Sequence, residues 1–133
     1  MKEKLHVSVE EYTTPNPFTA QVDTTVGELV GLMKKEGVRH VPILDGENIV
    51  GIVSERDLTV ASKFSDGLSL SAGDIMTPEP LIVYSSESLA NVAYQMSEQK
   101  IGSAIIIFSD DSSMGIFTST DALNALVEII SPD

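Results

Sequence analysis

The sequence predicts an α+β protein made of two β-α-β-β-α repeats that pack against each other as one pseudo-two-fold module. Three observations support this prediction: an internal duplication, a shared order of strand and helix patterns in the two copies, and the short length of each copy. A repeat of roughly 60 residues buries little apolar surface alone, so the two copies are expected to cover each other's exposed sheet faces.

The duplication is visible in turn residues and in a longer motif. Thr14-Pro15-Asn16-Pro17 returns in the second half of the chain as Thr77-Pro78-Glu79-Pro80. The segment Gly51–Asp57 returns as Gly115–Asp121, at an offset larger by one position, because the second copy has one more residue in a preceding turn. So many aligned positions are not readily supplied by chance, and they indicate a tandem repeat.

The first copy is expected to hold a short strand, an amphipathic helix, two strands and a closing helix. Thr25 and Glu28 have the spacing of a capping box at the start of the first helix, and Gly37 is suited to end it. Asp45-Gly46 is typical of a tight turn between two strands. The expected elements are Phe18–Val22, Thr25–Glu36, Val41–Leu44, Ile49–Val53 and Glu55–Phe64.

The second copy is expected to follow the same order. Its elements are Leu81–Tyr84, Glu87–Gln99, Ala104–Phe108, Met114–Phe117 and Ser119–Ile130. The boundaries place the first domain at 9–64 and the second at 74–130, with a linker at 65–73 that is rich in Ser, Asp and Gly.

Composition narrows the class of protein. The formal net charge of -12 disfavours nucleic acid as a partner, since an acidic surface repels phosphate backbones. The absence of cysteine excludes disulfides, thiolate metal sites and cysteine nucleophiles. No signal peptide and no apolar run long enough for a membrane span is apparent, so the cytoplasm is the expected location.

The repeated layout, with its Thr-Pro-x-Pro start and its Gly-Ile-Val-Ser-x-x-Asp finish, resembles the CBS-domain (cystathionine-β-synthase domain) family. The resemblance runs from about Val9 to about Val127, and Gly73–Thr77 fits the family's lead-in better than Val9–Thr14 does. It implies a disc-like pair of domains with two related clefts between the halves. In many members these clefts bind AMP, ADP, ATP, S-adenosylmethionine or a related adenosyl compound, and no cofactor is required.

The resemblance implies that the strand-to-helix motif contacts the ligand. This assigns Ser54 and Asp57 to one site and Thr118 and Asp121 to the other, with each carboxylate accepting from ribose hydroxyls. The same Ser/Thr-x-x-Asp spacing is also a helix-capping pattern that needs no ligand. Both roles can coexist.

The two copies differ in their cationic residues. Arg39, His40 and Arg56 are expected to reach ligand phosphates, although they could instead pair with carboxylates on an acidic surface. In the second copy Gly102-Ser103 replaces Arg39-His40, and Thr120 replaces Arg56. The two sites are therefore expected to be unequal.

The rest of the site is implied by the family positions. Thr19 and Ile82 would meet the adenine edge through their backbone, and apolar or small residues would line the ring. For the apolar residues an ordinary core role is the competing interpretation. These wall residues are Val41, Pro42, Ala104 and Ile105, and Ser103 is a further candidate for ligand contact.

Catalysis and metal binding are not expected. His6 and His40 fall in different elements with no metal-ligand spacing, and no His accompanies Ser54 or Thr118 within its motif. The sequence therefore favours a non-catalytic sensor that binds an adenosine-containing ligand, forms a homodimer through its helices and acts on an unknown effector protein. The alternative is a protein-interaction scaffold with vestigial clefts; an enzyme is the least supported interpretation.

Overall fold

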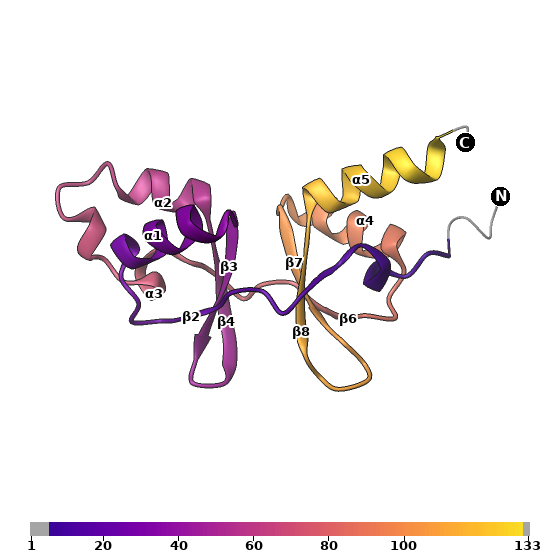
Figure 1. Cartoon of the computed structure of the whole chain (residues 1–133), viewed down its shortest axis with the longest axis horizontal. Helices are drawn as coiled ribbons and strands as arrows, with labels where there is room; N and C mark the ends of the chain where they lie inside the picture. Colours follow the sequence, from indigo (N-terminus) through magenta and orange to yellow (C-terminus); the bar gives the residue numbers. More distant parts are fainter. Residues whose placement is uncertain (1–5, 132–133) are drawn as a thin grey trace. The chain divides into compact units, whose positions relative to one another are not determined.

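The computed structural model of the chain describes residues 6–131, and its contacts divide the chain into two units (Figure 1). The first unit is Phe18–Pro80. The second unit combines the N-terminal stretch up to Pro17 with the chain from Leu81 onward. Each unit is a four-stranded mixed sheet with its helices, in agreement with the predicted α+β class.

The first unit has strand order β2-β3-β4-β5, with β2 parallel to β3 and the other neighbours antiparallel. Its long helices α1 and α2 lie side by side in Figure 1. The elements are β2 (Ala20–Gln21), α1 (Val26–Glu36), β3 (His40–Asp45), β4 (Asn48–Ser54), α2 (Glu55–Ala61), η3 (Gly67–Ser69), α3 (Ala72–Ile75) and β5 (Thr77–Pro78).

The second unit has strand order β1-β8-β7-β6, with β6 parallel to β7 and the other neighbours antiparallel. The elements are η2 (Val9–Tyr12), β1 (Thr14–Pro15), β6 (Ile82–Tyr84), α4 (Leu89–Gln99), β7 (Ser103–Ile107), β8 (Met114–Thr118) and α5 (Ser119–Ile130).

The two sequence repeats do not coincide with the two structural units, because each unit contains the segment that precedes the other repeat. Strand β1 precedes the first repeat in sequence and pairs with β8, and β5 precedes the second repeat and pairs with β4. Both of these short strands were expected only as Pro-x-Pro turns. The strands predicted at Phe18–Val22 and Leu81–Tyr84 are shorter than expected, at Ala20–Gln21 and Ile82–Tyr84.

The sequence signals that predicted α1 are realised in the structure. The Thr25 hydroxyl accepts from the Glu28 N–H at 3.1 Å, and the Glu28 carboxylate accepts from the Thr25 N–H at 3.1 Å. Gly37 ends the helix with φ +67°, a left-handed conformation that glycine adopts without a Cβ penalty. The capping box and the glycine stop are both confirmed.

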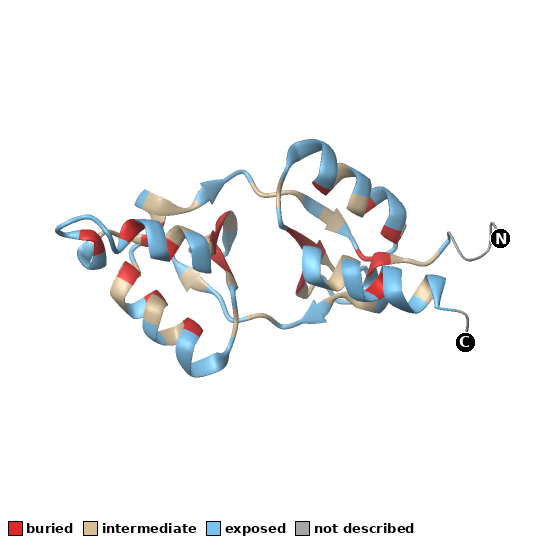
Figure 2. Ribbon diagram, turned by 90° about the horizontal axis from the view of Figure 1, so that it is seen from above, coloured by how far each residue is buried: buried red, intermediate tan, exposed pale blue. Residues whose placement is uncertain are grey.

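Each unit has its own hydrophobic core between helices and sheet. In the first unit Val41, Ile43 and Val53 pack with α1 and α2, and in the second Ala104, Ile106 and Phe117 do so with α4 and α5. Successive strand residues point to opposite faces, so His40 and Pro42 lie on the face of their sheet away from the helices. Figure 2 shows that buried residues occupy one face of each long helix.

Two predicted boundaries differ from the structure. The closing helix of the first repeat ends at Ala61 instead of Phe64. The segment 65–73, predicted as linker, contains η3 and the beginning of α3. None of the helices within residues 6–131 combines the length and apolar character that a membrane span needs.

Candidate functional site

The end of β4 and the start of α2 hold the first predicted ligand motif. The Asp57 Oδ2 atom accepts from the Ser54 N–H at 2.8 Å, and the Ser54 hydroxyl accepts from the Asp57 N–H at 3.2 Å. The motif is therefore a capping box, which is the alternative that the sequence left open. Ser54 is half-buried, and the cap engages Oδ2 of Asp57, so Oδ1 is the oxygen that a ligand hydroxyl can address.

The strand register brings further predicted residues to this place. His40 on β3 lies directly opposite Ser54 on β4. The Glu55 N–H at the start of α2 donates to the Arg39 carbonyl at 2.8 Å, which ties the start of β3 to the helix. Arg39, His40, Ser54 and Asp57 therefore gather at one end of the sheet. Arg39 and Arg56 are exposed, and His40 is half-buried.

The second unit repeats this arrangement with different side chains. The Asp121 Oδ2 atom accepts from the Thr118 N–H at 2.8 Å, and the Thr118 hydroxyl accepts from the Asp121 N–H at 3.3 Å. Ser103 lies opposite Thr118, and the Ser119 N–H donates to the Gly102 carbonyl at 2.9 Å. The geometry is that of the first motif, without its two arginines and its histidine.

The predicted apolar wall divides into two groups. Val41 and Ala104 are fully buried in the helix-side cores, so their side chains have the packing role that was the competing interpretation. Pro42 is buried on the opposite face of its sheet, which is the face that His40 shares. In the second unit Ser103 takes the position of His40 and is only 9% exposed.

Thr19 and Ile82 lie at the outer edges of the two sheets. Thr19 comes just before β2, where Ala20 pairs with Ile43 of β3. Ile82 pairs with Ile105 of β7 and is 44% exposed. Strand β3 or β7 therefore lies between each of them and the strand that ends at its motif, and the backbone role expected for them remains a prediction.

Sequence reasoning missed two contributions to the site. It gave Arg39 a side-chain role only, whereas the Arg39 carbonyl also fixes the start of α2. It also placed His40 in the same candidate site as Ser54 without identifying the strand pairing that sets the two residues directly opposite each other. The recurrence of the same carbonyl bond at Gly102 and Ser119 shows that it belongs to the repeat.

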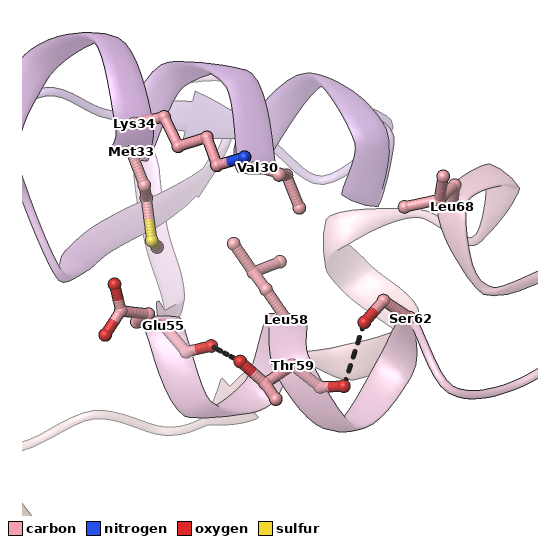
Figure 3. A pocket seen from close by; sticks show the side chains of 8 residues that line it. All are labelled: Val30, Met33, Lys34, Glu55, Leu58, Thr59, Ser62 and Leu68. Carbon is pink, nitrogen blue, oxygen red and sulfur yellow. Dashed lines mark hydrogen bonds between the residues drawn. The ribbon is translucent and has the colours of Figure 1, made fainter.

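Two surface hollows lie between helices. The first lies between α1 and α2, with Met33 and Leu58 at its base and Lys34 and Glu55 among its lining (Figure 3). The second lies between α4 and α5 and is lined by aliphatic side chains. In the described part of the chain, the predicted ligand residues line neither hollow. Within residues 6–131 no group of three or more acidic or His side chains is arranged to hold a metal ion.

Comparison with known proteins identifies the family. The CBS domain family matches residues 9–63 and 72–128. A homoserine O-acetyltransferase from Methanosarcina acetivorans is 30% identical over 125 residues, which cover 91% of this chain and 22% of that enzyme. The chain spans 22–38% of the length of the first three curated relatives that it matches.

Solved structures share the fold. The crystal structure of CBSX2 from Arabidopsis thaliana in complex with AMP has a TM-score of 0.75 and 27% identity, covering 92% of this chain and 98% of that chain. The CBS domain pair of protein MJ0100, in complex with 5′-methylthioadenosine and S-adenosyl-L-methionine, has a TM-score of 0.80 and 24% identity. It covers 92% of this chain and 97% of its own.

Proposed function

Because the chain belongs to the CBS-domain family, with one domain in each repeat, we propose that it is a regulatory module that binds an adenosine-containing ligand. The proposed binding residues are those at the ends of β4 and β8. One observation carries the proposal: Arg39, His40, Ser54 and Asp57 meet at a single strand-to-helix junction, although the whole β3–β4 hairpin separates the first two from the last two in sequence.

The chemistry of the first junction suits a phosphorylated nucleoside. A carboxylate that is already held in place by a cap can accept from two adjacent ribose hydroxyls through its other oxygen. Arg39 and Arg56 are exposed, and a guanidinium offers paired donors that match phosphate oxygens. These cations also offset the repulsion that a chain of net charge -12 exerts on an anionic ligand.

The related structures support the class of ligand. CBSX2 was solved with AMP, and the MJ0100 domain pair with 5′-methylthioadenosine and S-adenosyl-L-methionine. These three compounds share an adenosine group and differ in charge. The arginines at the first junction favour a phosphate-bearing ligand there, such as AMP, ADP or ATP. The cation-poor second junction favours an uncharged or positively charged adenosyl compound.

The proposed role is non-catalytic. Ser54 pairs with His40 across the two strands, but its hydroxyl accepts the capping hydrogen bond from the Asp57 N–H, so the position of the hydroxyl is explained by the helix start. The matched enzyme is a much longer protein in which this chain covers 22% of the length. We propose that this chain works in the cytoplasm as a homodimer and that ligand binding changes its affinity for an effector protein.

The first test is a thermal-shift panel on the purified chain with AMP, ADP, ATP, S-adenosylmethionine and methylthioadenosine, with GTP as the control. A ligand at a hundred times its dissociation constant stabilises a protein by about 2.7 kcal/mol. For a chain of this size the midpoint should rise by about 10 °C or somewhat less. Stabilisation by an adenosine compound and not by GTP supports the proposal.

Matched variants assign the response to the first junction. The double variant Arg39→Ala, Arg56→Ala should lose most of the stabilisation by phosphate-bearing ligands and keep that by methylthioadenosine. The control is Lys34→Ala, Lys35→Ala, which removes the same charge from the exposed side of α1. A panel without any shift would reject adenosine binding and favour the scaffold alternative, for which the cation-poor second junction is the supporting observation.

A further inference from the structure

The hollow between α1 and α2, here called the α1/α2 hollow, has an apolar base. Met33 and Leu58 form this base and are only 5% and 4% exposed, and Val30 and Leu68 add aliphatic carbon at the sides (Figure 3). The volume of the hollow is about 290 Å³. Pockets for drug-sized ligands measure about 300–1,000 Å³, so this hollow has the size for a compact molecule that is smaller than a nucleotide.

Charged and hydroxyl groups surround the apolar base. Lys34 comes from α1, Glu55 and Thr59 come from α2, and Ser62 follows α2 directly. The Thr59 hydroxyl donates to the Glu55 carbonyl at 3.1 Å, and the Ser62 hydroxyl donates to the Thr59 carbonyl at 2.9 Å. Among the eight lining residues drawn in Figure 3, no hydrogen bond joins the Lys34 ammonium to the Glu55 carboxylate. A cation and an anion from two helices therefore border the hollow without being bonded to each other.

The equivalent hollow of the second unit lacks this pair of charges. At the repeat offsets, Ser97 takes the place of Lys34 and Ser119 takes the place of Glu55. In the part of the chain that the structure describes, the lining of that hollow is aliphatic throughout. Because the second repeat forms the same helix pair without the two charges, the fold itself does not require them in the first.

We propose that the α1/α2 hollow binds a free α-amino acid with an aliphatic side chain. The side chain of the ligand lies on Met33 and Leu58, which gains apolar contact. Its α-carboxylate accepts from the Lys34 ammonium, and its α-ammonium donates to the Glu55 carboxylate. Both protein groups are exposed, so the ligand reaches them from solvent. A zwitterion has no net charge, and the chain's net charge of -12 therefore does not repel it.

The two opposite charges distinguish an amino acid from simpler apolar ligands. A carboxylate without an ammonium leaves Glu55 unmatched, and it is also an anion approaching an acidic chain. An amine without a carboxylate leaves Lys34 unmatched. A leucine within a partner protein offers the same aliphatic contact, but its α-amino and α-carboxyl groups are peptide groups without charge.

A ligand panel on the purified chain tests this chemistry. L-Leucine, L-isoleucine and L-methionine should raise the thermal midpoint, and glycine should not, because it has no side chain to cover the base. 4-Methylpentanoate and 3-methylbutylamine each resemble leucine without one of its charged groups. Each should bind at least about tenfold more weakly than leucine in isothermal titration calorimetry, since one charge-assisted hydrogen bond is lost. Equal affinity for leucine and 4-methylpentanoate, or no response to any amino acid, would overturn the proposal.

Matched variants assign the response to the hollow. Lys34→Gln and Glu55→Gln remove the charges while keeping the length of the side chains, and each should weaken leucine binding at least about tenfold. Lys35→Gln and Glu36→Gln remove the same charges from exposed positions on α1 that do not line the hollow, and they should bind leucine as the wild type does. Unchanged affinity in both Lys34→Gln and Glu55→Gln would refute the site.

The adenosine panel on the same samples keeps this site separate from the proposed function. Lys34→Gln should retain the midpoint shift with adenosine compounds, and the double variant Arg39→Ala, Arg56→Ala should retain the shift with leucine. A wild-type chain that responds to leucine and to no adenosine compound would support the amino-acid site and reject the proposed function. A chain that responds only to adenosine compounds would do the reverse.

Discussion

Ser54 and Thr118 cap α2 and α5 by the same reciprocal pair of hydrogen bonds, and the carboxylates of Asp57 and Asp121 accept from the capping backbone N–H at 2.8 Å in both units. Around this common cap the side chains diverge: Arg39, His40 and Arg56 surround the first, and Gly102, Ser103 and Thr120 take their places at the second. The cap stabilises the start of a helix in both units, whereas the charge of the neighbouring side chains differs between the units. The Ser/Thr-x-x-Asp motif alone therefore marks a helix start, and the proposed preference of the first junction for an anionic ligand depends on the neighbouring cations.

The cores of the two units also differ in the size of side chains at equivalent positions. Substitutions at these positions are expected to have the largest effect on stability. Phe117 on β8 and Val53 on β4 are equivalent positions, and both are fully buried. Phe117→Ala should lower the free energy of unfolding by about 3–5 kcal/mol, since a large cavity is left behind. Val53→Ala removes two carbons and should cost roughly 1.5–3 kcal/mol. Urea denaturation followed by circular dichroism measures both, and an equal or larger loss for Val53→Ala would contradict this ordering.

The ligand motifs themselves provide the second comparison. Asp57→Ala and Asp121→Ala each remove the acceptor of a capping box, so their effects on stability should match at roughly 1 kcal/mol. The two substitutions should, however, differ in their effects on ligand affinity. For the phosphate-bearing ligand with the largest thermal shift, Asp57→Ala should weaken affinity tenfold or more, which corresponds to about 1.4 kcal/mol.

Isothermal titration calorimetry on both variants tests this difference in affinity. Asp121→Ala should weaken binding of the same ligand no more than Asp57→Ala does. Unchanged affinity in Asp57→Ala together with a large loss in Asp121→Ala would reverse the roles assigned to the two junctions.

Local signals were enough to predict most of the fold. Helix α5 was predicted at its observed bounds, and α1 within one residue, because capping residues and apolar spacing are encoded within a few positions of each other. The pairing of β1 with β8 and of β5 with β4 was not predicted. A strand this short has no alternating pattern, and its partner lies at the far end of the other repeat or across a linker.

The residues proposed for the site could be named from the sequence, whereas the strand register that brings them together could not. Counting back along β3 and β4 from the Asp45–Asn48 turn would place His40 opposite Val53. The structure shifts the pairing by one residue between Ile43 and Leu44, which brings His40 opposite Ser54. Such a shift depends on contacts around the bulge and leaves no mark in the local sequence.

The C-terminal ends of α1 and α4 allow a further comparison of the two units, with a smaller expected effect on stability. Gly37 and Lys100 occupy equivalent positions with φ +67° and +57°. A side chain in this left-handed conformation costs about 1–2 kcal/mol, part of which is offset by the lower flexibility of the unfolded chain. Lys100→Gly should therefore raise the free energy of unfolding by about 0.5–1 kcal/mol, and Gly37→Lys should lower it by about 1 kcal/mol. Chemical denaturation would contradict this if Lys100→Gly were destabilising.

The smallest effect on stability is expected in the segments that precede the two repeats. Ser71–Asp74 and Ser8–Glu11 are equivalent in these segments. Ser71 and Asp74 form a capping box, whereas the Ser8 side chain makes no capping hydrogen bond. Hydrogen bonds from the Ser71 backbone N–H and then from its hydroxyl lower the pKa of Asp74. A carboxyl with a lowered pKa stabilises the fold above its unfolded value of about 4, and this contribution is lost as the pH falls through the folded value.

Asp74→Asn keeps the acceptor oxygen and removes the charge, so it isolates this pH-dependent term. The variant should be slightly less stable than the wild type at about pH 7, and the difference should shrink as the pH falls through the lowered folded pKa of Asp74, where the wild-type carboxyl also loses its charge. Thermal midpoints across this range measure the difference, and Glu11→Gln serves as the control because Ser8 forms no such cap. A difference that stayed constant with pH, or that was matched by Glu11→Gln, would place the effect of Asp74 outside the capping box.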